Sequence, residues 1–301
     1  MKIRLGARGS ALSLAQARLV AASLDGRAEV EIVTITTTGD RLSAAGSPIE
    51  WKGDFTRELD EALLDGRIAL AVHSLKDVPS RVPDGIALAA VPAREDPSDV
   101  LISRGKRPFA DLPSGARLGT SSPRRRAQLL AARPDLEVLE ARGNVDTRLA
   151  RLAAGRFDAI VLARAGLARL GRLAEISEVL PASLVLPAIG QGALAILARR
   201  DDAALLSMLG ALDDAASRRE VEAERSLLAT LEAGCRAPVA GLARARGERL
   251  TVSAAVFSPN GATTLREETA GLAREAAELG RAAGQRLLER GAAALMAEGG
   301  A

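Results

Sequence analysis

The stretch ARLGTSSPRRR at residues 116–126 decides the fold, because it combines the signals of one strand and one helix. Leu118 lies in a short apolar run that is followed by a polar turn. Ser122 is a residue type that caps helices, and Pro123 stands in the favoured first helical position. The stretch therefore predicts a strand, a tight turn and a helix, which together form the repeating unit of α/β proteins.

Two more stretches have the same order of a strand, a polar turn and a capped helix. A strand at residues 3–5 precedes a helix whose predicted N-cap is Ser10. A strand at residues 137–140 precedes a helix whose predicted N-cap is Asn144. The recurrence favours an α/β fold over an all-helical or all-β one.

A further helix and strand precede a polar turn. Apolar residues repeat at helical spacing from Phe55, and Gly66 is the predicted stop of that helix. Residues 68–72 form a buried strand, which delivers the turn HSLKDVP at residues 73–79. We expect this turn at the carboxyl edge of the sheet, where α/β proteins bind ligands.

The pattern predicts three domains. Proline-bearing segments at 92–97 and 181–187 flank the second α/β block and indicate paired hinges with a ligand cleft between two α/β domains. After residue 214 the pattern changes to a charged helix, alternating strands and a Pro-Asn-Gly hairpin turn. The predicted domains are domain 1, discontinuous at 1–93 and 188–213; domain 2 at 98–186; and a smaller α+β domain 3 at 215–301.

Composition excludes several classes of protein. The 301 residues contain one cysteine and one histidine, so an internal disulfide and the usual Cys/His zinc sites are excluded, and no motif predicts another metal. No apolar run is long enough to span a membrane, and Met1 is not followed by a signal-peptide core. We therefore expect a cytoplasmic protein that does not bind membranes.

Arginines gather at the predicted helix starts. Four of the 41 basic residues are lysines, which leaves 37 arginines, so a single arginine carries little information. Arg124, Arg125 and Arg126 nevertheless share one first helical turn, and Arg8 and Arg142 lie beside two others. A helix start carries partial positive charge, and a bound anion would offset the repulsion. The arginines are either solvated surface charges or a site for carboxylates or phosphates, and their recurrence favours the site.

Three other residues are ambiguous from their neighbours alone. Asp77 follows a buried strand. It is either a turn residue or surface ion-pair partner, or a carboxylate that stabilises a cationic intermediate or shuttles protons. The position of His73 directly after apolar Val72 favours a hydrogen-bonded structural role over that of a catalytic base. Cys235 is either an inert buried thiol or, because Gly234 and Arg236 flank it, a reactive thiol on a turn beside a cation.

Taken together, ordered motifs along nearly the whole chain resemble the porphobilinogen deaminases, also called hydroxymethylbilane synthases. The combination is far more specific than any one motif. The matching segments are Arg8-Gly9-Ser10 with Gln16, residues 73–79, residues 119–125, Arg142-Gly143-Asn144-Val145, Gly190-Gln191-Gly192 and Gly234-Cys235.

The resemblance implies two domains like those of type II periplasmic binding proteins, with a third domain that carries the cysteine. It implies a thioether between Cys235 and a dipyrromethane cofactor, onto which four porphobilinogen molecules are condensed with loss of ammonia. The expected product is hydroxymethylbilane, which serves tetrapyrrole and heme biosynthesis. The expected enzyme is a monomeric transferase with no nucleic-acid partner.

The resemblance also implies residue roles. Asp77 is the catalytic residue, which contacts pyrrole N–H groups and stabilises the azafulvene-like cation. Cys235 is the attachment point. The residues expected to bind cofactor or substrate are Arg8, Ser10, Gln16, Lys52, Phe55, Ser74, Lys76, Thr120, Ser121, Ser122, Arg124, Arg125, Arg142, Asn144, Arg148 and Gln191.

The chain departs from the family pattern mainly at residues 48–55. There Trp51 and Asp54 stand where the family has a glycine-rich stretch and an apolar residue, although Lys52 and Phe55 keep their places. This puts in doubt the length and closure of the mobile loop expected over the cleft. Ala233 also replaces a common glycine.

Two other classes share some of these features. A solute-binding module would have the paired domains and anion pocket, but it would have no use for Cys235 or Asp77 and would normally be exported. A nucleic-acid binder could use the arginine-rich helix start at Arg124, but aromatic residues are only 2% of the chain and tyrosine is absent, so bases have few stacking partners.

Overall fold

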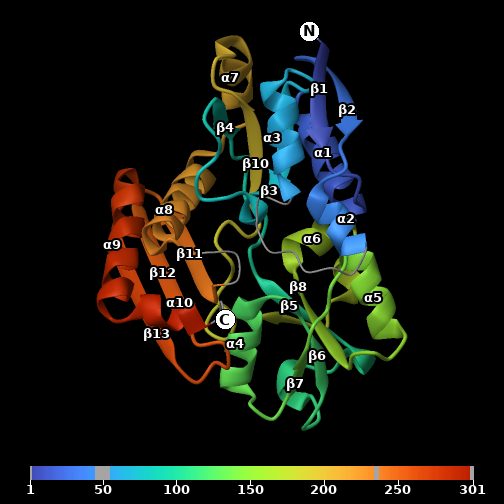
Figure 1. Ribbon diagram of the computed structural model, residues 1–301, viewed down its shortest axis with the longest axis vertical. Helices are drawn as coiled ribbons and strands as arrows, with labels where there is room; N and C mark the ends of the chain where they lie inside the picture. The colour runs from blue at the N-terminus through green and yellow to red at the C-terminus, as the bar shows by residue number, and fades with distance from the viewer. Residues whose placement is uncertain (1, 45–54, 234–236, 299–301) are drawn as a thin grey trace. The chain divides into compact units, whose positions relative to one another are not determined.

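The computed structural model describes residues 2–44, 55–233 and 237–298. The chain forms two compact units, one of residues 1–95 and 192–218 and the other of residues 96–191 and 219–301 (Figure 1). None of the described helices is both long and apolar enough to cross a membrane.

The first unit is built on a five-stranded mixed sheet in the order β2-β1-β3-β10-β4. β1, β2 and β3 are parallel, and β10 is antiparallel to both of its neighbours. The strands are β1 (Lys2–Ala7), β2 (Glu29–Thr34), β3 (Leu70–Ser74), β4 (Ile86–Ala90) and β10 (Leu194–Arg199). The helices are α1 (Ala11–Ser23), α2 (Thr38–Ala44), α3 (Arg57–Leu64), the 3-10 turn η2 (Leu75–Asp77) and α7 (Ala203–Gly210).

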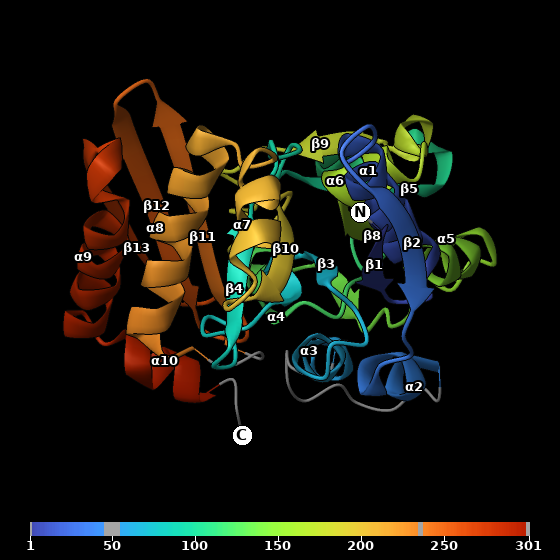
Figure 2. The same ribbon diagram turned by 90° about the horizontal axis from the view of Figure 1, so that it is seen from above.

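Helices cover both faces of this sheet. Val20 of α1 and Leu205 of α7 belong to one apolar cluster with Leu5 and Ile196 of the strands. α3 covers the opposite face, where a β-carbon on Gly6 would come within 2.9 Å of the Leu59 side chain. Figure 2 shows α1 and α3 on opposite sides of β1 and β3. The central strands β3 and β10 are therefore buried on both faces, as their apolar sequences require.

The second unit contains a sheet of the same topology, in the order β7-β6-β8-β5-β9. Here β5 is the antiparallel strand, and it comes directly after the proline-bearing segment at 92–97. The strands are β5 (Asp99–Ser103), β6 (Arg117–Gly119), β7 (Glu137–Leu139), β8 (Ala159–Ala163) and β9 (Glu178–Leu180). The helical segments are η3 (Arg104–Lys106), η4 (Phe109–Asp111), α4 (Pro123–Ala132), α5 (Val145–Ala153), α6 (Arg164–Arg169) and η5 (Leu173–Glu175).

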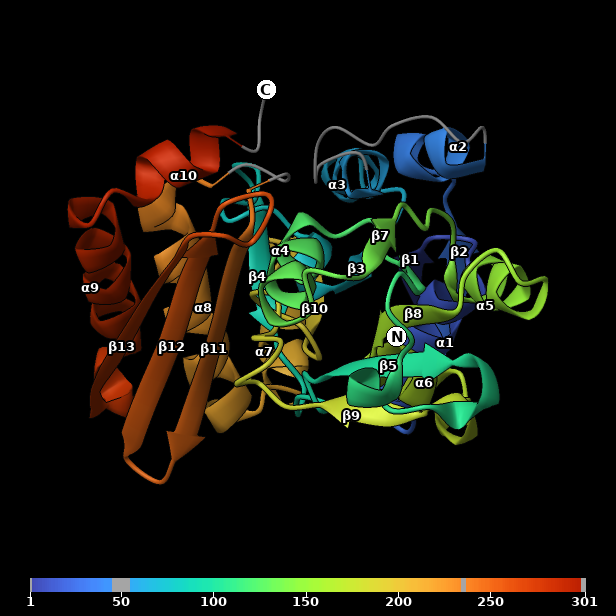
Figure 3. The same ribbon diagram turned by 90° about the horizontal axis from the view of Figure 1, so that it is seen from below.

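The C-terminal part is a three-stranded antiparallel sheet with helices (Figure 3). The strands are β11 (Val239–Arg246), β12 (Arg249–Phe257) and β13 (Thr264–Leu272). The helical segments are α8 (Ala215–Leu231), whose first turn belongs to the first unit, η6 (Ala273–Glu275), α9 (Ala276–Glu289) and α10 (Ala292–Glu298). Leu227 of α8 and Leu287 of α9 bury one face of the sheet with Val252.

The other face of this small sheet packs on α4, where Phe257 and Ala127 share a buried cluster. The hairpin turn after β12 contains Gly261, which has a φ of +76°. A β-carbon there would lie only 2.1 Å from the carbonyl oxygen of Ala127. Glycine is therefore required both by the backbone conformation and by the close approach of the turn to α4.

The predicted α/β fold class with a smaller α+β part is confirmed, and so are the three helix starts. Ser10 accepts a hydrogen bond from the Ser13 amide at 3.2 Å, and Asn144 accepts one from Thr147 at 2.9 Å. Ser122 accepts one from the Arg125 amide at 3.4 Å, with Pro123 at the first helical position. The predicted strand at 68–72 begins later, at Leu70. The three-domain boundaries and the cleft stay predictions.

Candidate active site

In the first unit, the predicted site residues follow the carboxyl ends of two neighbouring parallel strands. Arg8 comes directly after β1, and Ser74 ends β3. β1 and β3 are paired, with Leu5 opposite Leu70, so their ends meet at one edge of the sheet. Gln16 of α1 is buried and donates a hydrogen bond from Nε2 to Ser74 Oγ at 2.7 Å, which joins the first helix to that edge.

Arg8 has an internal partner at this edge. Its Nε donates to Asp40 Oδ1 at 3.0 Å, and its guanidinium lies 4.0 Å from the centre of the Phe55 ring. Although burial raises the pKa of Asp40, the hydrogen bond from Arg8 and the Arg8 charge together hold that pKa below its usual value. Arg8 and Phe55 were both expected to bind the ligand. In the structure, Phe55 stacks on the Arg8 guanidinium, and Arg8 also pairs with the Asp40 carboxylate.

Asp77 lies in η2, one turn beyond β3, beside Lys76. Both side chains are half-buried. Within residues 2–44, 55–233 and 237–298, no hydrogen bond or ion pair holds the Asp77 carboxylate. A carboxylate in this position can accept hydrogen bonds from a ligand without first breaking internal ones.

His73 is buried in β3, as the structural interpretation predicted. Its Nε2 has no hydrogen-bond partner among the described residues, so the expectation of a hydrogen-bonded histidine is wrong for this nitrogen. Burial, and after it the nearby charge of Arg8, lowers the pKa of His73 to about 4. The imidazole is therefore neutral at neutral pH, which disfavours it as a proton donor.

In the second unit, polar residues follow the carboxyl ends of β6 and β7. Thr120 is buried, Ser122 donates its backbone N–H to Thr120 Oγ1 at 3.2 Å, and Ser121 is exposed. Arg142 follows β7, pairs with Glu140 at 2.7 Å and keeps 30% of its side chain exposed. Asn144 is exposed at the start of α5.

Arg148 lies one helical turn after Asn144 on α5 and is half-buried. Gly143, immediately before the cap, has a φ of +100°, which favours glycine in this turn. Because β6 and β7 are parallel neighbours, the structure brings the hydroxyl groups after β6 and the arginine after β7 to one edge of the sheet.

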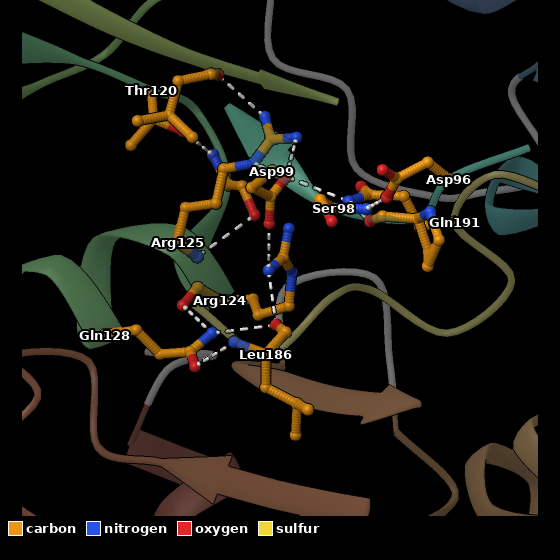
Figure 4. Close-up of polar contacts among 12 residues, drawn as sticks. Asp96, Ser98, Asp99, Thr120, Arg124, Arg125, Gln128, Leu186 and Gln191 are labelled. Carbon is orange, nitrogen blue, oxygen red and sulfur yellow. Dashed lines mark hydrogen bonds and ion pairs between the residues drawn. The ribbon is translucent and has the colours of Figure 1, made fainter. Parts of the chain in front are cut away.

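Arg124 and Arg125 converge on a buried carboxylate of the chain itself, that of Asp99 (Figure 4). Arg124 Nη1 donates to Asp99 Oδ2 at 2.7 Å, and Arg125 Nη2 donates to Asp99 Oδ1 at 2.6 Å. Gln191 donates to the same Oδ1 at 2.9 Å and to the carbonyl oxygen of Pro97 at 2.6 Å. Sequence patterns predicted an anion at this helix start, and the structure supplies an internal one.

The network is buried, and its two guanidinium groups share one carboxylate. Asp99 is completely buried, and Arg124 and Arg125 are only 4% and 5% exposed. Although burial alone raises the pKa of Asp99, the two guanidinium groups hold that pKa well below its usual range. A carboxylate with a depressed folded-state pKa stabilises the fold above its unfolded pKa of about 3.9, and that contribution is lost as the pH falls through the folded value.

Replacing Asp99 by alanine is expected to lower the free energy of unfolding by about 3–5 kcal/mol, because two buried guanidinium groups lose their counter-charge. Denaturant unfolding at pH 7 measures the change. Asp201→Ala is the control, because Asp201 pairs with Arg199 at 3.2 Å but its side chain is 81% exposed. We expect no measurable change in the control. Equal stability of the two variants would contradict a structural role for the network.

Sequence patterns missed both Asp99 and Asp40. Asp99 begins β5 directly before the apolar run Val100-Leu101-Ile102. A charged residue at the start of such a run is the one local signal that could have indicated it. Asp40 lies 32 residues from Arg8, and nothing in its neighbourhood indicates that pairing. Two predicted residues, Lys52 and Cys235, lie outside the described part of the chain.

The two α/β sheets have mixed topology, with polar and cationic residues following the carboxyl ends of the parallel strands. This places the chain in the class of α/β proteins that bind ligands at the sheet edge. Residues 3–207 match the family model described as the porphobilinogen deaminase, dipyrromethane cofactor binding domain, and residues 218–289 match the porphobilinogen deaminase C-terminal domain. The chain belongs to the porphobilinogen deaminase family.

Porphobilinogen deaminases of other organisms are similar to this chain in sequence over almost its full length. The chain is 52% identical over 297 residues to the porphobilinogen deaminase of Rubrobacter xylanophilus, covering 98% of this chain and 96% of that protein. It is 49% identical over 300 residues to that of Desulforudis audaxviator, covering 98% and 97%. A BvgS VFT2 domain from Bordetella pertussis is a similar solved structure, at 18% identity and a TM-score of 0.43, covering 70% of this chain and 84% of that one.

Proposed function

We propose that this chain is a hydroxymethylbilane synthase. It condenses four porphobilinogen molecules onto a dipyrromethane cofactor and releases hydroxymethylbilane and ammonia. The observation that carries this proposal is the match of residues 3–207 to the cofactor-binding domain of the family. The test is an assay of the purified protein with porphobilinogen, in which ammonia and hydroxymethylbilane should form in a ratio of four to one.

The residues present suit such a cofactor. Porphobilinogen and the pyrroles made from it carry acetate and propionate groups, which need cationic partners and hydroxyl donors. Arg142, with 30% of its side chain exposed, and the exposed Ser121 follow adjacent strand ends. When bound, the dipyrromethane supplies the pyrrole carbon to which the first substrate is joined.

Asp77 is the proposed catalytic residue. When ammonia leaves the aminomethyl group of porphobilinogen, the carbon–nitrogen bond breaks and the substrate becomes an azafulvene-like cation. A fixed carboxylate that accepts hydrogen bonds from the pyrrole N–H stabilises that positive charge as it develops. In support, Asp77 is half-buried, beside a strand end, and has no internal partner among the described residues.

The other predicted residues divide into binding and positioning roles. We propose that Arg8, Arg142, Arg148 and Lys76 bind carboxylates of the ligand, together with Lys52. We propose that the side chain of Phe55 contacts the ligand ring. Hydrogen bonds to the ligand come from Ser10, Ser74, Thr120, Ser121, Ser122 and Asn144. Arg124, Arg125, Gln16 and Gln191 keep the ligand-binding role predicted from the sequence. Because Arg124, Arg125 and Gln191 all donate to Asp99, and Gln16 donates to Ser74, we propose that these four residues also position the edge of each sheet.

The remaining parts of the proposal concern the whole protein. We propose three domains at the boundaries predicted from the sequence, with Cys235 in the third as the thioether attachment point. We propose that the enzyme is a cytoplasmic monomer that binds neither nucleic acid nor membranes. The sparse aromatic residues, 2% of the chain, support the proposal that no nucleic acid is bound, and the single cysteine supports Cys235 as the attachment point.

Replacing Arg142 by leucine is expected to slow product formation by about tenfold to a hundredfold, because a charge-assisted contact with a ligand carboxylate is lost. Initial rates of hydroxymethylbilane formation measure the effect. Arg107→Leu is the control, because Arg107 is an exposed arginine of the same unit at a site without a proposed role. If both variants keep the wild-type rate, Arg142 does not bind the ligand.

A further inference from the structure

A pocket of about 300 Å³ lies in the first unit, between α3 and the segment that follows η2. One wall is formed by the first two turns of α3 with Thr56, and the other by residues 79–83. The residues that line it are Thr56, Arg57, Asp60, Glu61, Leu64, Pro79, Arg81, Val82 and Pro83. None of them belongs to the proposed active site, although Pro79 is only two residues beyond Asp77.

Asp60 is the unusual member of this lining. It is 7% exposed, and its Oδ1 has no hydrogen-bond partner among the described residues. Burial raises the pKa of Asp60 to about 6, with a hydrogen bond from Thr56 opposing the shift and Glu61 adding to it. At pH 8 the group is therefore a buried carboxylate, one oxygen of which receives no hydrogen bond from a described residue. Such a carboxylate destabilises the folded protein unless a ligand donates a hydrogen bond to its unpaired oxygen.

The rest of the pocket has complementary features. Arg81 is exposed, and within the described chain its guanidinium has no hydrogen bond or ion pair. Arg57 is held at the rim by Glu61, at 3.6 Å. Between the charges the walls are apolar, with Leu64 46% exposed and Pro79, Val82 and Pro83 beside it. The pocket thus offers an anionic acceptor, a separate cation without a partner among the described residues, and apolar walls.

We propose that this pocket is an accessory binding site for a small aromatic ammonium compound that also carries a carboxylate. The ammonium group donates to Asp60, the carboxylate accepts from Arg81, and the ring packs on the proline-lined wall. Porphobilinogen belongs to this chemical class, and naming it as the natural ligand rests on the proposed function. The pocket itself does not depend on that function.

The test uses two unreactive probes with the full-length, cofactor-loaded protein at pH 8. 4-(Aminomethyl)benzoate carries both charges, and benzylamine carries only the ammonium group. Titration calorimetry is expected to show that Asp60→Asn weakens both probes by about tenfold or more, because a charge-assisted hydrogen bond is lost. Arg81→Gln is expected to weaken 4-(aminomethyl)benzoate by about threefold to tenfold and to leave benzylamine unchanged.

Asp65→Asn is the matched control. Asp65 caps the C-terminal end of the same helix and does not line the pocket, so both probes should bind this variant as they bind the wild type. The proposal is overturned if neither probe binds the wild type, or if Asp60→Asn and Arg81→Gln bind both probes with wild-type affinity. Arg81 is exposed, so its variant reports on binding even if Asp60→Asn fails to fold.

Turnover of porphobilinogen by the same wild-type preparation separates the two proposals. Product formation without probe binding would reject the accessory pocket and leave the proposed function in place. Probe binding that depends on Asp60, without product formation, would support the pocket and reject the function.

Discussion

Replacing Asp77 by asparagine is expected to lower turnover by roughly 10²–10³-fold, while the protein folds and keeps its cofactor. The physical reason is that asparagine preserves the shape but removes the charge that faces the developing azafulvene-like cation. Stability should change little, because Asp77 is half-buried and holds no ion pair with another described residue. The loss should therefore appear in kcat, with intact-protein mass and unfolding midpoint as in the wild type.

Asp84→Asn is the matched control for this experiment. Asp84 is an exposed aspartate on the loop before β4, seven residues further along the chain. It should keep wild-type kcat. A near-normal kcat for Asp77→Asn would reject the catalytic assignment, and an unchanged kcat with a raised KM would assign Asp77 to ground-state binding instead.

Much of the fold could be predicted because its signals are local. Ser10, Ser122 and Asn144 each cap the helix that follows them, since a side-chain oxygen and an amide three residues away are enough to set the start. Gly66 ends α3 in the same local way, with a φ of +70°. Alternating apolar residues in β12 and the turn around Gly261 likewise predicted the C-terminal hairpin.

The balance of charge could not be predicted, because it depends on contacts distant in the sequence. Arg8 and Asp40 are 32 residues apart, and Arg125 and Asp99 are 26 apart. A pattern of arginines at a helix start indicates that an anion is needed there, but it does not distinguish a ligand from a carboxylate of the chain. That distinction adds a positioning role to the ligand-binding role predicted for Arg124 and Arg125.

Replacing Cys235 by serine is expected to abolish product formation entirely. Cys235 is the only cysteine of the chain, so its thiol is the only one that could form a thioether. Arg236 follows it directly, and a neighbouring cation favours the nucleophilic thiolate. A serine hydroxyl is far less acidic and less nucleophilic, so the variant should be isolated without the cofactor.

Intact-protein mass spectrometry measures this directly. The wild type should exceed the mass of its sequence by two linked pyrrole units, and Cys235→Ser should match the mass of its sequence. Ala237→Ser, two residues away in the same segment, is the control for disturbance of the local chain, and it should keep both the added mass and the activity. An unmodified wild type with full activity would reject covalent attachment, whereas added mass on Cys235→Ser would place the attachment on another residue.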